Sequence, residues 1–221
     1  MHNSSRAMPR RHQHAERCGA DWAWPRGTIS GRRRPAEHCA AAAAVLQEVT
    51  QPHALGLAGW SGAGKTTLLI RLIPALVARG LRVSTIKRAH HDFDVDQPGK
   101  DSWTHRQAGA TEVLVSSSRR WALMHELRDA PEPTLAELLK RLSQTDLVLI
   151  EGFRRGTHPK LEVFRAANQK PPLHPSDPSV VGIISDIPFP EAGRPVAGLD
   201  DIPSVADLVL HSAVPAAAMG A

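Results

Sequence analysis

The feature that most constrains this chain is the segment from Gly59 to Thr66, which fits G-x-x-x-x-G-K-[ST] at every fixed position. Glycines let the backbone of such a loop curl so that several N–H groups point at phosphate oxygens. The lysine reaches the β- and γ-phosphates of a nucleotide, and the final hydroxyl ligates Mg²⁺. We expect nucleotide contacts from Gly59, Ser61, Gly62, Ala63, Gly64, Lys65, Thr66 and Thr67, with Thr66 also binding the metal.

The segments around this loop alternate between strand and helix patterns. Residues 54–58 form a short apolar run, and residues 66–79 have apolar side chains at helical spacing that stop at Gly80. Further strands are expected at 81–86, 111–116, 120–124, 147–150, 161–164 and 180–184, and further helices at 101–108, 135–142 and 201–210. The alternation predicts an α/β domain of the P-loop NTPase type over residues 54–215, with a mostly parallel sheet flanked by helices.

The first 50 residues differ from this body in composition. Residues 1–53 carry eight arginines and four acids, a net charge of +4 out of +5 for the chain, whereas the remainder has a net charge of +1. This segment lacks apolar periodicity and contains five consecutive alanines, 40–44. We predict a low-complexity, disordered basic leader over 1–50. Because the body is nearly neutral, we do not expect a nucleic-acid interface.

Cysteine content and hydropathy indicate the compartment. Cys18 and Cys39 both lie in the leader, so the body has neither a disulfide nor a cysteine-based metal site. No stretch approaches the ~20 apolar residues that span a bilayer. The sequence predicts a cytoplasmic protein with no membrane partner.

A second magnesium ligand is expected at the end of a neighbouring strand. The apolar run 147–150 is followed by Glu151, and ligands of such sheets bind at the carboxyl ends of the strands. Asp146 precedes the same run and should face away from the site. Glu151 is therefore the predicted metal-binding acid.

The loop after the strand at 81–86 also reaches this edge of the sheet. Lys87 and Arg88 can offset phosphate charge, and Asp92 is the predicted additional oxygen on the Mg²⁺ side. The D-x-D-x-D spacing of residues 92–96 resembles a Ca²⁺ loop, but it lacks the required glycine and the Glu at position twelve. The pair His90-His91 is compatible with a transition metal, although adjacent histidines in a polar loop are more often simply solvated.

With these residues placed, the chain resembles the MobB-type adaptors of molybdopterin-guanine dinucleotide biosynthesis. The matching stretches are 59–77, 86–103, 118–127, 147–154 and 183–189. The second is the most specific, because it carries HHDFDVD followed by PGKDS. Arg88 departs from the family, which is expected to have a histidine after the lysine, and the leader is not part of the resemblance.

The resemblance implies properties that the composition does not show. It implies binding of GTP with Mg²⁺, slow hydrolysis at most, and a homodimer. It also implies service to a MobA-type guanylyltransferase that attaches GMP to molybdopterin, with molybdopterin itself a further candidate ligand. Read without the resemblance, the residues establish only a Mg²⁺–triphosphate site in an α/β domain.

Two other functions remain open at this stage. A small-molecule P-loop kinase usually has an arginine-bearing lid, and no clear lid segment is evident. Arg154 and Arg155 are placed to approach a phosphate or an anionic pterin, or they lie in a solvated loop. A regulatory GTPase would normally carry N-K-x-D for guanine, and that motif is absent from the sequence.

Asp186 is the predicted base-reading residue. It follows the apolar strand 180–184 and therefore lies at the carboxyl edge of the sheet. Its carboxylate can accept hydrogen bonds from guanine N1–H and the 2-amino group, whereas adenine offers no such donor pair. The alternative is an Asp that caps a turn before Pro188. The implied GTP preference favours the guanine role.

Overall fold

The computed structural model describes residues 51–89, 93–143 and 145–220, and the expected leader lies outside these ranges. The strands are β1 (His53–Ala58), β2 (Val83–Lys87), β3 (Glu112–Ser116), β4 (Trp121–His125), β5 (Leu147–Glu151), β6 (Lys160–Phe164), β7 (Val180–Ser185), β8 (Val196–Gly198) and β9 (Val214–Pro215). The helices are α2 (Lys65–Ala78), α3 (Asp101–Gln107), α4 (Leu135–Lys140) and α5 (Ile202–Ser212), with 3-10 helices η1 (Ala166–Asn168) and η2 (Ala216–Gly220).

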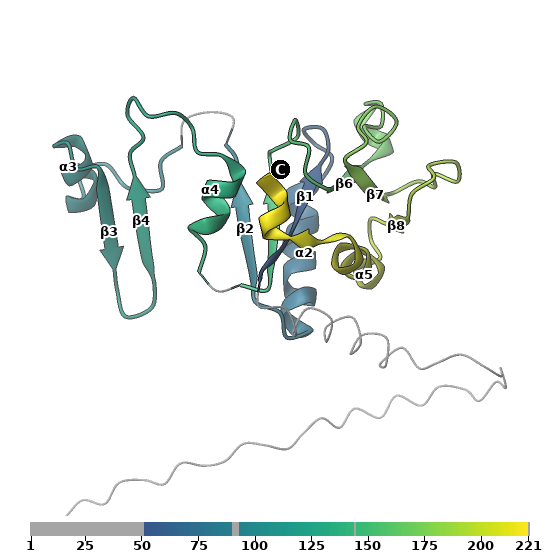
Figure 1. Ribbon diagram of the computed structural model, residues 1–221, viewed down its shortest axis with the longest axis horizontal. Helices are drawn as coiled ribbons and strands as arrows, with labels where there is room; N and C mark the ends of the chain where they lie inside the picture. Colours follow the sequence, from purple (N-terminus) through teal and green to yellow (C-terminus); the bar gives the residue numbers. More distant parts are fainter. Residues whose placement is uncertain (1–50, 90–92, 144, 221) are drawn as a thin grey trace, which may run out of the picture. The chain divides into compact units, whose positions relative to one another are not determined.

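Seven of the described strands form one sheet, with β1 near its centre (Figure 1). The strand order is β2-β5-β1-β6-β7-β8, and every neighbouring pair along this path is parallel. β9 pairs antiparallel with the first residues of β1. The predicted α/β fold with a mostly parallel sheet is therefore confirmed.

One face of this sheet is covered by α2 and α5. Alternate residues along each strand point to the same face, so Leu55, Leu149 and Leu161 share it. These side chains pack with buried residues of the two helices, among them Leu72 and Val209, in a single apolar cluster. This cluster holds α2 against β1, and the loop between them is thereby fixed at both ends.

The other face is covered in two different ways. Under β5 and the start of β1, it packs against α4 and η2 in a second apolar cluster, formed by Ala54, Ile86, Leu135, Leu139, Val148, Ile150 and Met219. Under β6, the same face presents Lys160 and Glu162, each 1% exposed. Irregular loops contact these two side chains, and no helix does so in the part of the chain that the structure describes.

Lys160 attaches two of these loops to the sheet. Its ammonium donates hydrogen bonds to the carbonyl oxygens of Arg154, at 3.3 Å, and Gly156, and to the Ser179 hydroxyl at 2.6 Å. It also lies 3.5 Å from the Asp177 carboxylate. A buried ammonium is tolerated only when its donors are satisfied, and here the loop carbonyls and the carboxylate satisfy them.

Glu162 attaches the β6–β7 connection to the sheet. Its carboxylate accepts hydrogen bonds from the backbone N–H groups of Leu173, at 2.6 Å, and His174, at 2.9 Å. The His174 ring nitrogen Nδ1 lies 3.0 Å from the same carboxylate. The β6–β7 connection is thus bonded to the middle of β6.

The loop between β5 and β6 packs closely against Gly56 of β1. The side chain of His158 passes over Gly56, where an added Cβ would lie 2.7 Å from His158 Nε2 and 2.8 Å from Lys160 Cβ. The Gly56 N–H donates to the carbonyl of Pro159 at 3.0 Å. A glycine is therefore required at this position of β1.

β3 and β4 pair only with each other among the described strands, as an antiparallel hairpin. Each strand and helix expected from the sequence is present, with boundaries that differ by at most two residues. The short elements β8, β9, η1 and η2 were not expected. The hairpin is the main topological difference, because its strands do not join the parallel sheet.

Candidate functional site

The loop between β1 and α2 is shaped by its glycines. Gly59 has a φ of 149°, and a Cβ there would lie 2.5 Å from the carbonyl oxygen of Val163 in β6. Gly64 has a φ of 90°, and its carbonyl accepts a hydrogen bond from Leu68 N–H at 2.8 Å as α2 begins. The backbone therefore curls between Gly59 and Gly64, and the amino end of α2 follows directly. This arrangement suits phosphate binding.

The Lys65 side chain folds back onto this loop. Its ammonium donates to the carbonyl oxygens of Gly59, at 2.8 Å, and Trp60, at 3.1 Å. Burial lowers the pKa of Lys65, the Glu151 carboxylate opposes this shift, and Lys87 and Arg154 add to it. The charged groups expected to surround a triphosphate are therefore near one another.

The two predicted metal ligands inside the described ranges are suited to Mg²⁺. Thr66 is exposed in the first turn of α2, and its hydroxyl bonds to no other described residue. Glu151 pairs in register with Leu57 of β1 and with Lys87 of β2, which places it at the carboxyl edge of the sheet. A hydroxyl and one carboxylate fit Mg²⁺, which completes its shell with phosphate oxygens and water.

The structure separates the other charged residues that the sequence analysis singled out. The Lys87 ammonium lies 4.0 Å from the Glu151 carboxylate and is mostly exposed. Asp146 lies at the opposite end of β5, where it accepts hydrogen bonds from the Arg82 backbone N–H and guanidinium, both at 2.7 Å. Asp92, and the pair His90-His91, lie outside the described residues. Among the described residues, no group of three or more His, Cys, Asp or Glu side chains gathers as a metal site.

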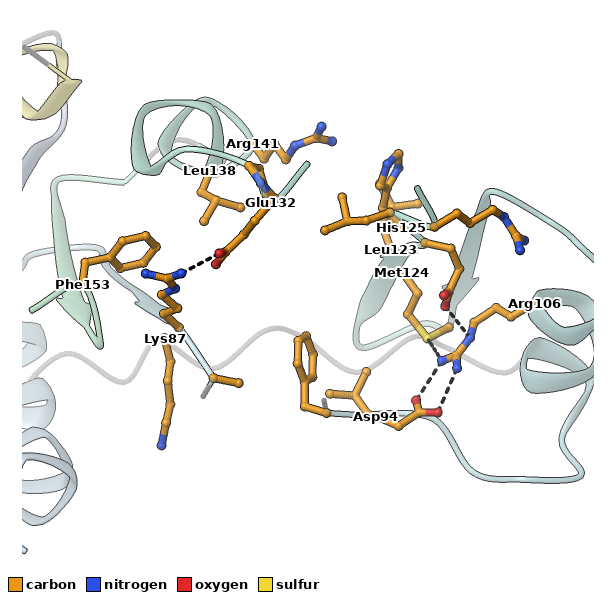
Figure 2. Close-up of a pocket in the computed structure, with 18 residues that line it drawn as sticks. Lys87, Asp94, Arg106, Leu123, Met124, His125, Glu132, Leu138, Arg141 and Phe153 are labelled. Carbon is orange, nitrogen blue, oxygen red and sulfur yellow. Dashed lines mark hydrogen bonds and ion pairs between the residues drawn. The ribbon is translucent and has the colours of Figure 1, made fainter. Parts of the chain in front are cut away.

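Asp94 takes part in an ion-pair network with Arg106 of α3. Arg106 of α3 donates to its two carboxylate oxygens at 2.7 and 2.8 Å and lies 3.0 Å from Glu126 (Figure 2). The Arg106 hydrogen bond is the main reason that the pKa of Asp94 is lowered to about 2. This network borders a cavity of about 730 Å³, and Phe153 and Glu132 lie on the opposite side of it.

Asp186 is bonded to a neighbouring loop. One of its carboxylate oxygens accepts a hydrogen bond from the Ala166 N–H, at 2.9 Å, at the start of η1. The turn before Pro188 is capped by another residue, since the Ser185 hydroxyl accepts from Ile187 N–H at 3.0 Å. Asp186 is exposed at the carboxyl edge of β7, beside the loop that follows β6.

Three contacts to the P-loop were not expected from the sequence. The Asn168 amide donates to the Ser61 carbonyl at 2.9 Å, and the Trp60 indole N–H donates to the Pro171 carbonyl at 2.8 Å. The Arg154 guanidinium lies over the Trp60 ring, 3.9 Å from its centroid. No sequence motif indicates these partners, because they are brought to the P-loop by the β6–β7 and β5–β6 connections.

Comparison with known proteins decides the family. The model of the family described as molybdopterin guanine dinucleotide synthesis protein B, MobB, matches residues 54–186, more than half of the chain. The chain belongs to the MobB family. The match begins in β1 and ends at Asp186, so it includes the P-loop, Glu151 and both buried charges of β6.

The individual relatives agree with the MobB assignment. The molybdopterin-guanine dinucleotide biosynthesis adapter protein of Escherichia coli is 47% identical over 71% of this chain and 91% of its own length. The Haemophilus influenzae protein of the same name is 41% identical over 70% of this chain and 86% of its own. A crystal structure of molybdopterin-guanine biosynthesis protein B aligns with a TM-score of 0.57 at 25% identity, covering 72% of this chain and 98% of that one.

The MobB fold is a P-loop nucleotide-binding fold, and the site described above occupies its P-loop. The leader falls outside the family match, as the resemblance indicated. Within the ranges that the structure describes, no helix is both long enough and apolar enough to cross a membrane.

Proposed function

We propose that this chain binds GTP with Mg²⁺ in the P-loop and acts as an adaptor in molybdopterin guanine dinucleotide synthesis, in the cytoplasm. In this role it assists a MobA-type guanylyltransferase that attaches GMP to molybdopterin, and it hydrolyses GTP slowly at most. The proposal is supported by membership of the MobB family and by the adapter names of the relatives.

The observation that carries the proposal is the Lys65 ammonium, which donates to the P-loop carbonyls and whose pKa is lowered by burial, an effect that the charge of Glu151 opposes. A bound triphosphate would replace the carbonyls as the partner of this ammonium and bring its own charge into the Coulomb field of Lys87 and Arg154. Thr66 and Glu151 would supply the protein oxygens for Mg²⁺, which would offset the charge of the phosphates.

The decisive experiment compares product formation with and without the guanylyltransferase. With GTP, Mg²⁺ and molybdopterin, this chain alone should form no dinucleotide, and it should raise the yield of the transferase. Lys65→Ala should abolish both the stimulation and the GTP binding seen by calorimetry, because it removes several charge-assisted contacts to the phosphates. A phosphorylated product formed by this chain alone would favour a kinase, and unchanged GTP affinity in the variant would refute the site.

Asp186 is proposed to read guanine through the carboxylate oxygen that no described residue occupies. Asp186→Asn keeps an oxygen for the Ala166 N–H but replaces an acceptor by a donor, so GTP should weaken and xanthosine triphosphate should improve. A buried polar mismatch costs about 1–3 kcal/mol, and we expect the preference between the two nucleotides to change tenfold or more. An unchanged ratio in competition calorimetry would assign Asp186 to the Ala166 contact alone.

A homodimer belongs to the same proposal. The β3–β4 hairpin exposes Leu114 and Trp121, each 61% accessible, together with Leu123, on one of its faces. A two-stranded sheet is marginal by itself, and a second copy would cover this apolar face. Light scattering on the purified chain measures the state directly, and a monomer at micromolar concentration would contradict this part of the proposal.

A further inference from the structure

A second cavity, of about 660 Å³, opens at the carboxyl ends of β2 and β5. Its lining consists of Arg88, Ala89, Gly152, Arg154, Arg155, Ser176 and Asp177. None of these residues belongs to the P-loop. The volume lies in the range of about 300–1,000 Å³ that is usual for small-molecule sites.

The charges around this cavity do not cancel. The Arg88 guanidinium is compensated by Glu132, 2.5 Å away. Asp177 faces the Lys160 ammonium and accepts hydrogen bonds from Ser179, so its negative charge is also compensated. The guanidinium groups of Arg154 and Arg155 have no ion pair with any residue of the described ranges.

The buried ammonium of Lys160 connects the two loops that form the walls of the cavity. Lys160 donates to the backbone carbonyls of Arg154 and Gly156 on one wall and contacts Asp177 on the other. Because the ammonium is 1% exposed, these bonds are shielded from water and hold both loops in one arrangement. Arg154 and Arg155 are therefore carried by a fixed loop, which lowers the entropic cost of binding a ligand.

The cavity also adjoins the nucleotide site. Arg154 lines it and stacks on Trp60, the second residue of the P-loop. The same guanidinium contributes to the lowered pKa of Lys65. A ligand in the cavity would therefore lie beside the triphosphate, with Arg154 between the two.

We propose that this cavity binds the phosphomonoester group of a second ligand while the P-loop holds the nucleotide. Two guanidinium groups without an ion pair among the described residues match the charge of a phosphate dianion, and their planar donors suit bidentate contact with phosphate oxygens. This inference rests on the proposed function, since an adaptor for nucleotidyl transfer gains from holding the nucleotide and its phosphorylated acceptor side by side.

The test uses phenyl phosphate as the probe and the full chain as the receptor. The P-loop is first saturated with a non-hydrolysable GTP analogue and Mg²⁺, at constant ionic strength and at a pH above the second phosphate pKa of about 6. Calorimetry should then show one phenyl phosphate bound per chain. Arg155→Ala should weaken this binding tenfold or more, and Arg155→Lys should weaken it less, because it keeps the charge but loses the fork.

Arg119→Ala is the matched control, because Arg119 is an exposed arginine that does not line the cavity. It should leave phenyl phosphate binding unchanged. Equal affinity in Arg155→Ala and the control would overturn the proposal, as would the absence of binding once the P-loop is filled.

Lys65→Ala separates this inference from the proposed function. It should lose the nucleotide but retain phenyl phosphate, which locates the anion outside the P-loop. If Lys65→Ala loses both ligands, phenyl phosphate occupies the P-loop and the second site is refuted. If the unaltered chain binds phenyl phosphate but not GTP, the proposed function fails while the cavity remains.

Discussion

Two halves of one sheet face are buried by opposite kinds of side chain. Beneath α4 and η2, the face is apolar, with Val148 and Ile150 each 1% exposed. Beneath the loops, it carries Lys160 and Glu162, which are buried to the same degree. The two halves are separated by only one strand, β1.

The difference follows from what covers each half. The first turn of α4 is closed by a capping box, in which the Thr134 hydroxyl accepts from Glu137 N–H and the Glu137 carboxylate accepts from Thr134 N–H, so the sheet meets this helix with apolar side chains alone. An irregular loop leaves carbonyls and N–H groups unpaired, and burial without partners would cost about 1–3 kcal/mol for each. Lys160 lies where loop carbonyls need a donor, and Glu162 lies where loop N–H groups need an acceptor.

The sharpest test of this comparison is Lys160→Met. It keeps most of the volume but removes the donor to two part-buried carbonyls and the ammonium that pairs with Asp177, and losing one partner of a buried ion pair costs about 3–5 kcal/mol. We expect a loss of about 4 kcal/mol in urea unfolding followed by circular dichroism. Lys140→Met, on the exposed end of α4, is the control and should change stability by less than about 0.5 kcal/mol. A similar small loss for Lys160→Met would mean that the loops do not depend on it.

The loop-covered half should also make stability depend on pH. Burial, with a smaller contribution from the Lys160 charge, lowers the pKa of His158 from 6.5 to about 4. Between these values, the unfolded chain binds a proton that the folded chain does not, so stability falls as pH falls from 6.5 to 4. The full shift corresponds to about 3 kcal/mol.

Comparison of two histidine variants isolates this effect. His158→Gln should flatten the dependence of unfolding free energy on pH between 4 and 6.5, whereas His105→Gln, on the exposed surface of α3, should leave it as it is. If both variants keep the slope of the unaltered chain, the histidine over Gly56 is not its source.

The smallest effect is expected in the apolar half. Ile150→Val removes one methyl group from the cluster beneath α4, which typically costs about 0.5–1.5 kcal/mol. Urea titration gives this loss of unfolding free energy directly. The slope of the unfolding free energy against urea concentration should not change. A loss as large as that of Lys160→Met would remove the contrast between the two halves.

The P-loop and its flanking elements were predictable from the sequence because each depends on local patterns. Gly59, Gly64 and Lys65 are fixed by a short motif, and the strand before it and helix after it have clear periodicities. Glu151 was placed by one further rule, that ligands gather at the carboxyl ends of parallel strands. The family resemblance then agreed with the family match over residues 54–186.

Tertiary structure alone decided the surroundings of that loop. Polar and apolar residues alternate from Lys160 to Val163, which normally indicates a solvent-exposed face, yet both charges are buried beneath loops. The partners of Trp60 lie about a hundred residues along the chain, where no spacing rule reaches. A charge in a sequence has no fixed environment, and only the folded backbone determines whether it meets water or an unpaired carbonyl.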